Sequence, residues 1–373
     1  MRFGHMLPNM MNNKIKLFIA AIAILAFGYN GCKQPTQQNN ITITPEAGTS
    51  YKAGDAVKVN VGNAKADSIV YLLDSVKFLV KKDTSGITLK TDTMKLGIKL
   101  ITARVYQDGK PQEVSTNIIL KAAKAPEEMS YVVEKVYPHD TGSYTEGFEY
   151  HDGFLYESSG GYLKPPDGGP AEKQSSLRKE DLETGKVVKM IKIDPTVFGE
   201  GITMIGNKII QLTYREHKGY VYDKDSFNLL STFNYTVGKE GWGLTFDGNK
   251  VYNSDGTNRV WFLNKDNYNP TGFIDVYDDK NEIDSVNELE YIDGKLYANV
   301  YQRDTILVID PKTGAVLQRV DMKNIWPKKD RPAGFDNDNN VLNGIAWDEK
   351  GKRLLITGKD WPHIYQVKFI PKK

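Results

Sequence analysis

The chain has 373 residues, enough for about two or three domains with a sizeable hydrophobic core. Its 49 basic and 47 acidic residues give a formal net charge of +2, which argues against nucleic acid as the main partner. The 21 Tyr, 14 Phe and 33 Gly residues are typical of many short strands joined by tight turns. The composition therefore predicts an all-β protein whose function depends on a local site.

The first 31 residues have the pattern of an export signal. Three basic residues precede an apolar run of 11 residues, Leu17–Phe27, which is too short for a comfortable membrane span. Gly31-Cys32 and a polar stretch follow, a pattern that resembles a bacterial lipoprotein signal. We expect residues 1–31 to be removed, Cys32 to carry the lipid and residues 32–40 to form a tether. This predicts an exported protein anchored to a membrane, in the periplasm or at the cell surface; an ordinary secretory signal with an incidental Cys is the alternative.

Residues 41–122 have the pattern of a small separate β domain. Short β-branched segments such as Val57–Val61 and Ile101–Tyr106 alternate in polarity and are separated by Gly-containing turns. Strands at this spacing predict an immunoglobulin-like sandwich, which we interpret as a spacer or docking module. Residues 123–130 are polar and contain Pro126, so they are predicted to be a linker.

Residues 131–373 contain a repeated unit. Each copy opens with a small or polar pair, continues as an alternating apolar strand, and is followed by a Gly-containing turn and a second strand. The second residues of these pairs, at positions 147, 201, 243, 288 and 344, are 54, 42, 45 and 56 positions apart. Strand repeats of this length are typical of propeller blades. The sequence thus predicts a five-bladed β-propeller.

Two further features of the propeller region follow from this interpretation. Residues 131–138 are predicted to pair with residues 364–369, because a strand from the other end of the chain commonly closes a propeller. A Pro- and Gly-rich insertion at residues 162–173 is expected on a rim, overhanging the site.

The residues that head the inner strands are the candidates for a site. Innermost strands crowd the axis, and side chains beside their glycines point into the channel or its mouth. The resulting mixture of carboxylates, carboxamides and an indole is the composition of a small-molecule pocket. These residues are Glu146, Glu200, Trp242, Asn287 and Asn343.

Eight motifs occur in order along residues 131–371. They are Tyr137-Pro138-His139-Asp140, Tyr144-Thr145-Glu146-Gly147, Phe198-Gly199-Glu200-Gly201, Gly241-Trp242-Gly243-Leu244, Ser254-Asp255-Gly256-Thr257, Asn287-Glu288-Leu289-Glu290-Tyr291, Leu342-Asn343-Gly344-Ile345-Ala346-Trp347 and Thr357-Gly358-Lys359-Asp360-Trp361-Pro362. Together they resemble the glutaminyl-peptide cyclotransferases of the plant and bacterial type. The resemblance implies a five-bladed propeller that converts the N-terminal glutamine of peptides or proteins to pyroglutamate with loss of ammonia. It implies no cofactor and no metal, and we expect a monomer.

The resemblance also implies catalytic roles for three residues. Glu200 matches the family's catalytic acid, which carries protons from the attacking amine to the leaving nitrogen. Asn287 matches a residue that hydrogen-bonds the γ-amide carbonyl. Lys359 matches a site lysine that orients Glu200 or binds a substrate carbonyl.

Six residues are expected to bind the substrate. Tyr144, Phe198 and Trp242 match the motifs of the family, and Phe198 and Trp242 form walls that hold the glutamine folded. Glu146 stands where plant members carry Gln, so it binds the α-ammonium or shares proton transfer with Glu200. Tyr214 and Tyr301 replace Trp, which keeps an aromatic face and adds a hydroxyl.

Two alternatives come from other functional classes. A metal-dependent propeller lactonase or related hydrolase would use Glu200, Asn287 and Asn343 as ligands of a divalent ion. A non-catalytic surface propeller would bind peptide or glycan through its Tyr-rich face. No set of His, Asp and Glu has the spacing of a known metal site, and His139 is interpreted as part of a structural corner.

Overall fold

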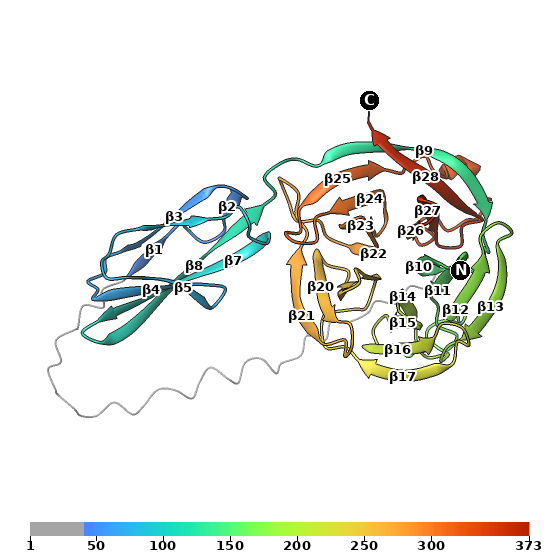
Figure 1. Cartoon of the computed structure of the whole chain (residues 1–373), viewed down its shortest axis with the longest axis horizontal. Coiled ribbons are helices and arrows are strands. Elements are labelled where there is room, and N and C mark those ends of the chain that lie inside the picture. Colours follow the sequence, from blue (N-terminus) through green and yellow to red (C-terminus); the bar gives the residue numbers. More distant parts are fainter. Residues whose placement is uncertain (1–40, 373) are drawn as a thin grey trace, which may run out of the picture. The chain divides into compact units, whose positions relative to one another are not determined.

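The computed structural model describes residues 41–372, and this part of the chain is built of strands, as predicted (Figure 1). The expected signal, the tether and Cys32 lie outside the described residues. Between residues 41 and 372 the structure has no helix long and apolar enough to cross a membrane. The one helical element of this region is a short 3-10 turn, η1 (Lys328–Asp330).

The first eight strands form two sheets that share one hydrophobic core. The smaller sheet has the order β1-β3-β6, with β1 (Thr42–Thr44), β3 (Ala56–Gly62) and β6 (Ile87–Lys90). The larger has the order β2-β8-β7-β4-β5, with β2 (Thr49–Lys52), β8 (Lys110–Lys121), β7 (Gly97–Gln107), β4 (Ser68–Leu73) and β5 (Val76–Lys81). Alternate residues of each strand point inward, so that Val57 and Val59 of β3 pack with Ile69 and Ile101 of the other sheet. This is the sandwich that the alternating pattern predicted.

The remaining strands form four-stranded groups around a common centre (Figure 1). The first group is β10 (Thr145–His151), β11 (Phe154–Ser159), β12 (Ser176–Asp181) and β13 (Lys186–Lys192). The second is β14 (Gly199–Ile205), β15 (Lys208–Thr213), β16 (Lys218–Asp223) and β17 (Leu229–Asn234). The third is β18 (Leu244–Phe246), β19 (Lys250–Ser254), β20 (Arg259–Asn264) and β21 (Pro270–Asp275). The fourth is β22 (Val286–Ile292), β23 (Lys295–Val300), β24 (Arg303–Ile309) and β25 (Val316–Asp321).

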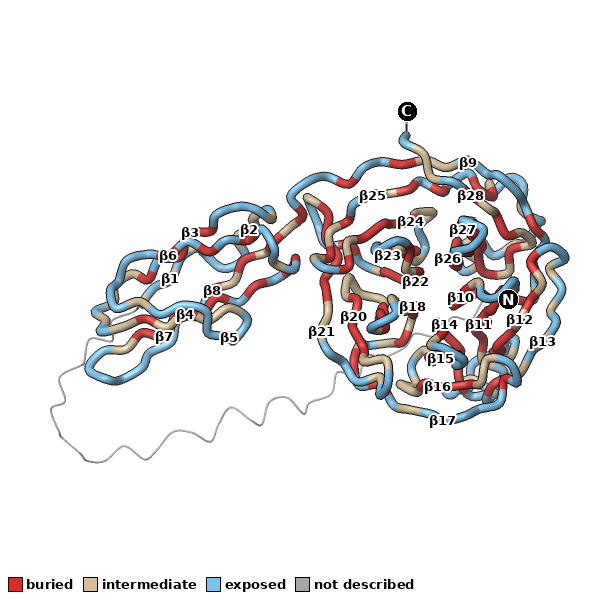
Figure 2. Tube along the Cα trace, viewed as in Figure 1, coloured by how far each residue is buried: buried red, intermediate tan, exposed pale blue. Residues whose placement is uncertain are grey.

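The last group combines both ends of this region. It consists of β26 (Leu342–Asp348), β27 (Arg353–Gly358), β28 (His363–Pro371) and β9 (Glu127–Pro138). The predicted closure is present, because β9 pairs antiparallel with β28 and places Tyr137 opposite Ile364. The inner strands β10, β14, β22 and β26 are mostly buried, whereas the rim strands β13 and β17 are largely exposed (Figure 2).

Strand β9 also makes a contact that the sequence did not predict. It begins at Glu127, inside the segment expected to be a linker, and pairs in parallel with β25, so that Met129 lies opposite Val320. The physical reason is burial: Met129 is 6% exposed and belongs to the hydrophobic core between the fourth and last groups. As a result, these two groups form one eight-stranded sheet.

Candidate active site

Irregular pairing positions the candidate residues at one end of the inner strands. The antiparallel register shifts between Thr145 and Gly147 in β10 and between Gly199 and Ile202 in β14. Equivalent shifts occur at the start of β22 and β26. Such bulges bend a strand and turn a side chain out of the regular alternation. They therefore allow the polar head residue of each inner strand to point to the mouth of the channel, while the residues that follow pack into the core.

The glycines beside these residues are required by close backbone approach. A Cβ on Gly147 would overlap the backbone of Gly201 and Ile202 in the next group. A Cβ on Gly243 would overlap the backbone of Asn287. Inner strands of neighbouring groups thus contact each other through bare backbone, as the repeat pattern predicted.

A buried ion pair joins the first and last groups at this end. Lys359 Nζ lies 2.5 Å from Glu146 Oε1, and the two side chains are only 4% and 3% exposed. The Asn343 amide donates to the carbonyl of Thr145 at 2.9 Å and lies 3.4 Å from Glu146 Oε2. Both oxygens of Glu146 therefore face protein donors, which fixes this carboxylate in place.

Glu200 is a buried carboxyl group of the site that has a free oxygen. It is 4% exposed, and its Oε2 has no hydrogen-bond partner among the residues that the structure describes. Burial raises the pKa of Glu200 well above its usual range, the negative charge of Glu146 raises it further, and Lys359 opposes the shift. Glu200 is thus kept protonated to a higher pH than an exposed glutamate. A carboxyl group of this kind can both donate and accept a proton near neutral pH.

The Asn287 side chain lies at the head of β22, which is separated from β14 by the inner strand β18. It is 3% exposed, and within residues 41–372 its Oδ1 has no hydrogen-bond partner. The main chain at this point is fixed, because the Ser254 hydroxyl donates to the Asn287 carbonyl at 2.7 Å. A buried carboxamide without a complete set of partners is available to a ligand.

Half-buried aromatic rings surround these polar groups. The Phe198 ring lies 6.2 Å from that of Tyr144 and 5.7 Å from that of Tyr214, centroid to centroid. Trp242 and Tyr301 form a second pair, with centroids 5.5 Å apart in an edge-to-face arrangement. Lys359 Nζ connects these three rings to the Trp242–Tyr301 pair, because it lies 4.5 Å from the Tyr144 centroid and 5.4 Å from that of Tyr301.

The structure therefore brings eight of the nine site residues predicted from the sequence into one network of contacts and charge interactions, and Asn287 heads a neighbouring inner strand of the ring. The network contains Glu146, Glu200, Lys359, Tyr144, Phe198, Tyr214, Trp242 and Tyr301. A cavity of about 450 Å³ lies beside it and is lined by Tyr144, Phe198 and Asp360 among others.

Sequence reasoning missed three supporting residues. The Tyr162 ring lies 5.2 Å from Phe198, and its hydroxyl donates to Glu216 at 2.7 Å. Glu240 accepts hydrogen bonds from Trp242 Nε1 at 3.1 Å and from Arg215 Nε at 3.2 Å. Tyr162 opens the predicted insertion, which was the available signal. Glu240 could have been found only from its position two residues before Trp242.

A second cavity of about 920 Å³ lies at the other ends of the inner strands and is lined by Glu149, Glu290 and Trp347 among others. Its carboxylates bridge neighbouring groups through the backbone. Glu149 accepts from the Met204 N–H at 3.1 Å, and Glu290 accepts from the Trp347 N–H at 3.0 Å. These contacts complete the hydrogen bonding of inner strands that cannot pair with each other directly.

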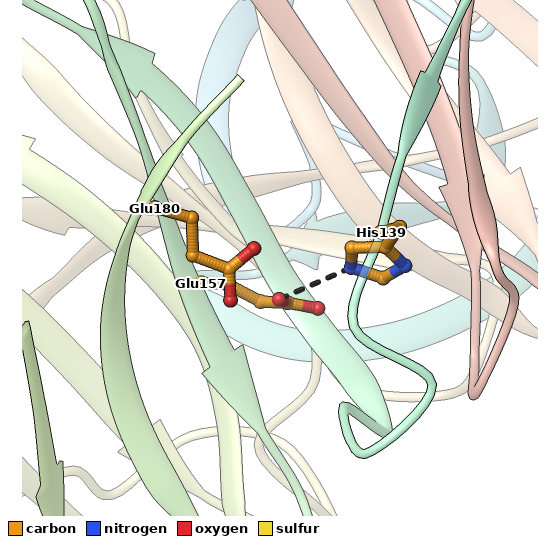
Figure 3. Close-up of side chains that lie close together, drawn as sticks. All are labelled: His139, Glu157 and Glu180. Carbon is orange, nitrogen blue, oxygen red and sulfur yellow. Dashed lines mark hydrogen bonds and ion pairs between the residues drawn. The ribbon is translucent and has the colours of Figure 1, made fainter. Parts of the chain in front are cut away.

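Among the described residues, one group of side chains has the composition of a metal site. His139, Glu157 and Glu180 offer ligand atoms that all lie within 4.8 Å of one another (Figure 3). Histidine nitrogen and carboxylate oxygen are ligands that zinc accepts. The same geometry also suits a protonated imidazole, because Nδ1 faces the Trp361 carbonyl at 2.8 Å and Nε2 faces Glu157 at 3.2 Å.

Comparisons with known proteins identify the class to which this propeller site belongs. A family model for glutamine cyclotransferase matches residues 105–369. A glutaminyl-peptide cyclotransferase of Arabidopsis thaliana is 37% identical over 235 residues, which are 62% of this chain and 69% of the relative. The crystal structure of Myxococcus xanthus glutaminyl cyclase matches with a TM-score of 0.59 and 29% identity, over 66% of this chain and 100% of that one. The chain belongs to the glutamine cyclotransferase family.

These findings confirm the propeller-type fold and the family resemblance found in the motifs. They do not support the metal-dependent hydrolase or the non-catalytic propeller.

Proposed function

We propose that this protein converts the N-terminal glutamine of peptides or proteins to pyroglutamate and releases ammonia. The observation that carries the proposal is the buried Glu200 carboxyl group, with one unpartnered oxygen, beside an ion pair and a ring of aromatic side chains. The family of the chain supports the same reaction.

The chemistry requires one proton to move between two nitrogens of the substrate. The α-amine nitrogen attacks the γ-amide carbon, a new C–N bond forms, and the carbonyl oxygen gains negative charge. Glu200 takes a proton from the attacking nitrogen and gives one to the γ-nitrogen, whose bond to carbon then breaks. Ammonia leaves, and the ring carbonyl re-forms, so that no atom or electron is left unbalanced. A carboxyl group with a raised pKa suits this exchange, because its proton affinity approaches that of the groups it serves.

Asn287 and Lys359 stabilise charge around this exchange. The Asn287 amide donates to the developing oxyanion, and one preorganised donor of this kind is typically worth about 3 kcal/mol. Lys359 is paired with Glu146, which supports a role in setting the charge around Glu200. Both oxygens of Glu146 have protein donors, so we assign Glu146 to the same electrostatic role and leave the proton transfer to Glu200.

The aromatic residues confine the substrate. Tyr144, Phe198 and Tyr214 form one wall, and Trp242 with Tyr301 forms the other. An intramolecular attack gains when the side chain is held folded back on its own amine, because the reacting atoms are already in contact.

The cellular setting proposed from the sequence concerns residues outside the described part of the chain. We propose an exported monomer, attached to a membrane through a lipid on Cys32, in which residues 41–122 act as a spacer or docking module. The support is the charged start, the 11-residue apolar run and Gly31-Cys32. The anchor is tested by replacing Cys32 with Ser and measuring the protein in membrane and soluble fractions. If the lipid on Cys32 anchors the chain, the variant is released from the membrane.

The reaction is tested by measuring ammonia release, and the matching loss of peptide mass, from a short peptide that begins with glutamine. We expect turnover by the wild-type chain and a loss of roughly 10²–10⁴-fold in Glu200→Gln, since this change removes the proton carrier. Glu349→Gln is the matched control, because this exposed carboxylate lines the cavity at the other ends of the inner strands. Normal turnover by Glu200→Gln would contradict the assignment of the proton carrier, and no turnover by the folded wild type would contradict the activity.

A further inference from the structure

The Glu146–Lys359 pair depends on two segments from opposite ends of the propeller region. Glu146 follows the first residue of β10, and Lys359 follows the last residue of β27. The two residues are 213 positions apart, and their distance is set where the first and last groups meet. A small slip at this seam would separate the pair and change the charge that faces Glu200.

A buried hydrogen-bonded path ties the two segments together. The Thr145 hydroxyl donates to Glu157 Oε1 at 2.6 Å, directly beside Glu146. Glu157 Oε2 lies 3.2 Å from His139 Nε2, and His139 Nδ1 lies 2.8 Å from the carbonyl of Trp361, two residues after Lys359. His139 and Glu157 are in direct contact (Figure 3), and both side chains are fully buried. The path thus runs from the neighbour of Glu146 to the segment that carries Lys359.

The charges around His139 and Glu157 favour a fixed contact between these two residues. Burial by itself would lower the pKa of His139, but the charge and hydrogen bond of Glu157 raise it to about 9. Glu180 and Arg178 face the same pair from β12, and His363 faces it from β28. The Trp361 carbonyl accepts from His139 Nδ1–H and a Glu157 oxygen faces Nε2, so both ring nitrogens have partners and the plane and direction of the ring are fixed.

We propose that the buried His139–Glu157 pair is a positioning device for cyclisation, which holds Glu146 and Lys359 together and so fixes the charge around Glu200. The proposal rests on the cyclase activity proposed above. His139, Glu157 and Thr145 are positioning residues, since they act on the reaction through the Glu146–Lys359 pair. A substitution at Thr145 can remove the hydrogen bond to Glu157 and leave the side chains of His139 and Glu157 unchanged.

Thr145→Val is the test variant, because it removes the hydroxyl and keeps the shape of the side chain, and Thr145→Ser is the rescue variant, because it keeps the hydroxyl. In the full chain, we expect Thr145→Val and Glu157→Gln to lower kcat by about 10-fold or more, since slight misplacement of a site is costly. KM should change by less than about threefold, because the aromatic walls are intact. Thr145→Ser should stay within about threefold of the wild type in both constants.

Two controls separate positioning from general loosening of the seam. Ile364→Val removes one methyl group from the core at the same seam and removes no hydrogen bond of the path, so its kcat should not change. The pH profile of kcat should shift in Thr145→Val and Glu157→Gln but not in Ile364→Val. The double variant Thr145→Val with Glu157→Gln should lose no more than Glu157→Gln alone, because both changes cut one path.

The wild-type chain is measured in the same assay. Turnover by the wild type together with an unaffected Thr145→Val, or an equal loss in Ile364→Val, would overturn the positioning role and leave the activity standing. Absence of wild-type turnover would overturn the activity and the positioning role with it. Metal analysis of the purified full chain adds a test of the charge state: an equimolar divalent metal that is lost in Glu180→Gln would overturn the ion pair.

Discussion

Lys359 Nζ contacts Glu146 Oε1 at 2.5 Å, and the two side chains are only 4% and 3% exposed, so the ion pair is largely shielded from water. Burial raises the pKa of Glu146 above its usual value, Lys359 opposes this shift, and both residues act on Glu200. The pKa of Glu200 therefore depends on residues from both ends of the propeller region, Glu146 in β10 and Lys359 directly after β27.

Breaking this pair is predicted to cost stability. Lys359→Met leaves Glu146 buried without its cation, and removing one partner of a buried pair typically costs about 3–5 kcal/mol. The double variant Lys359→Met with Glu146→Gln removes both charges, so we expect it to recover much of the loss. Urea unfolding of the three proteins measures these free energies. A double variant as unstable as Lys359→Met would show that the pair is not what stabilises the seam.

Removing only the negative charge is predicted to change the pH profile. The charge of Glu146 raises the pKa of Glu200, so Glu146→Gln should move the limb of the kcat profile that belongs to Glu200 to lower pH. Glu216→Gln is the control, because Glu216 acts on Glu200 in the same direction but more weakly. Rates measured from acidic to alkaline pH show which variant shifts the profile further. A larger shift in Glu216→Gln than in Glu146→Gln would contradict the stronger effect of Glu146 on Glu200.

Close packing against the Phe198 ring is predicted to require glycine at position 160. A Cβ on Gly160 would overlap the Phe198 ring and approach Glu146 Cγ. Gly160→Ala should therefore displace Phe198 and raise KM by roughly 10-fold or more, since misplaced binding groups lose substrate contacts. Gly169→Ala in the nearby insertion is the matched control, because its Cβ would meet only the side chains of Asp167 and Pro165. Equal KM values for the two variants would show that Phe198 does not form the wall.

Stability is predicted to fall as the solution becomes alkaline. The pKa of His139 is raised from 6.5 to about 9, and burial together with the charge of Glu157 raises the pKa of Glu180 from 4.5 to about 8. A raised folded-state pKa gives stability that is present below the unfolded value and is lost as pH rises through the folded value. Both contributions are therefore present in acidic solution; that of Glu180 is lost between about pH 4.5 and pH 8, and that of His139 between about pH 6.5 and pH 9.

The contribution of Glu157 to stability depends on pH in the opposite direction. Burial alone would raise the pKa of Glu157, but His139 lowers it from 4.5 to about 2, so its contribution is present above pH 4.5 and is lost as pH falls toward 2. Melting temperatures from pH 3 to pH 10 should show both declines. Glu180→Gln removes one titrating group, so its alkaline decline should start at higher pH than that of the wild type. An identical alkaline decline in both proteins would show that Glu180 does not contribute to it.

The sequence by itself indicated the strands, the candidate site residues and the closure of the ring, because each leaves a local pattern. Alternating polarity marks strands such as β3 and β14, and the glycines at 147 and 243 mark points where backbones approach. The pairing of β9 with β28 followed from the need to cover sheet edges. The motif around Glu200 indicated the family, which the comparisons then confirmed.

Only the tertiary structure decided which of these residues act on one another. Glu146 and Lys359 are 213 positions apart, and His139, Glu157 and Trp361 come from three separate segments. Their contacts depend on how the first and last groups meet, and no local periodicity encodes the geometry of that seam. The early start of β9 at Glu127 has the same origin, because a polar segment becomes a strand only when β25 offers a free edge.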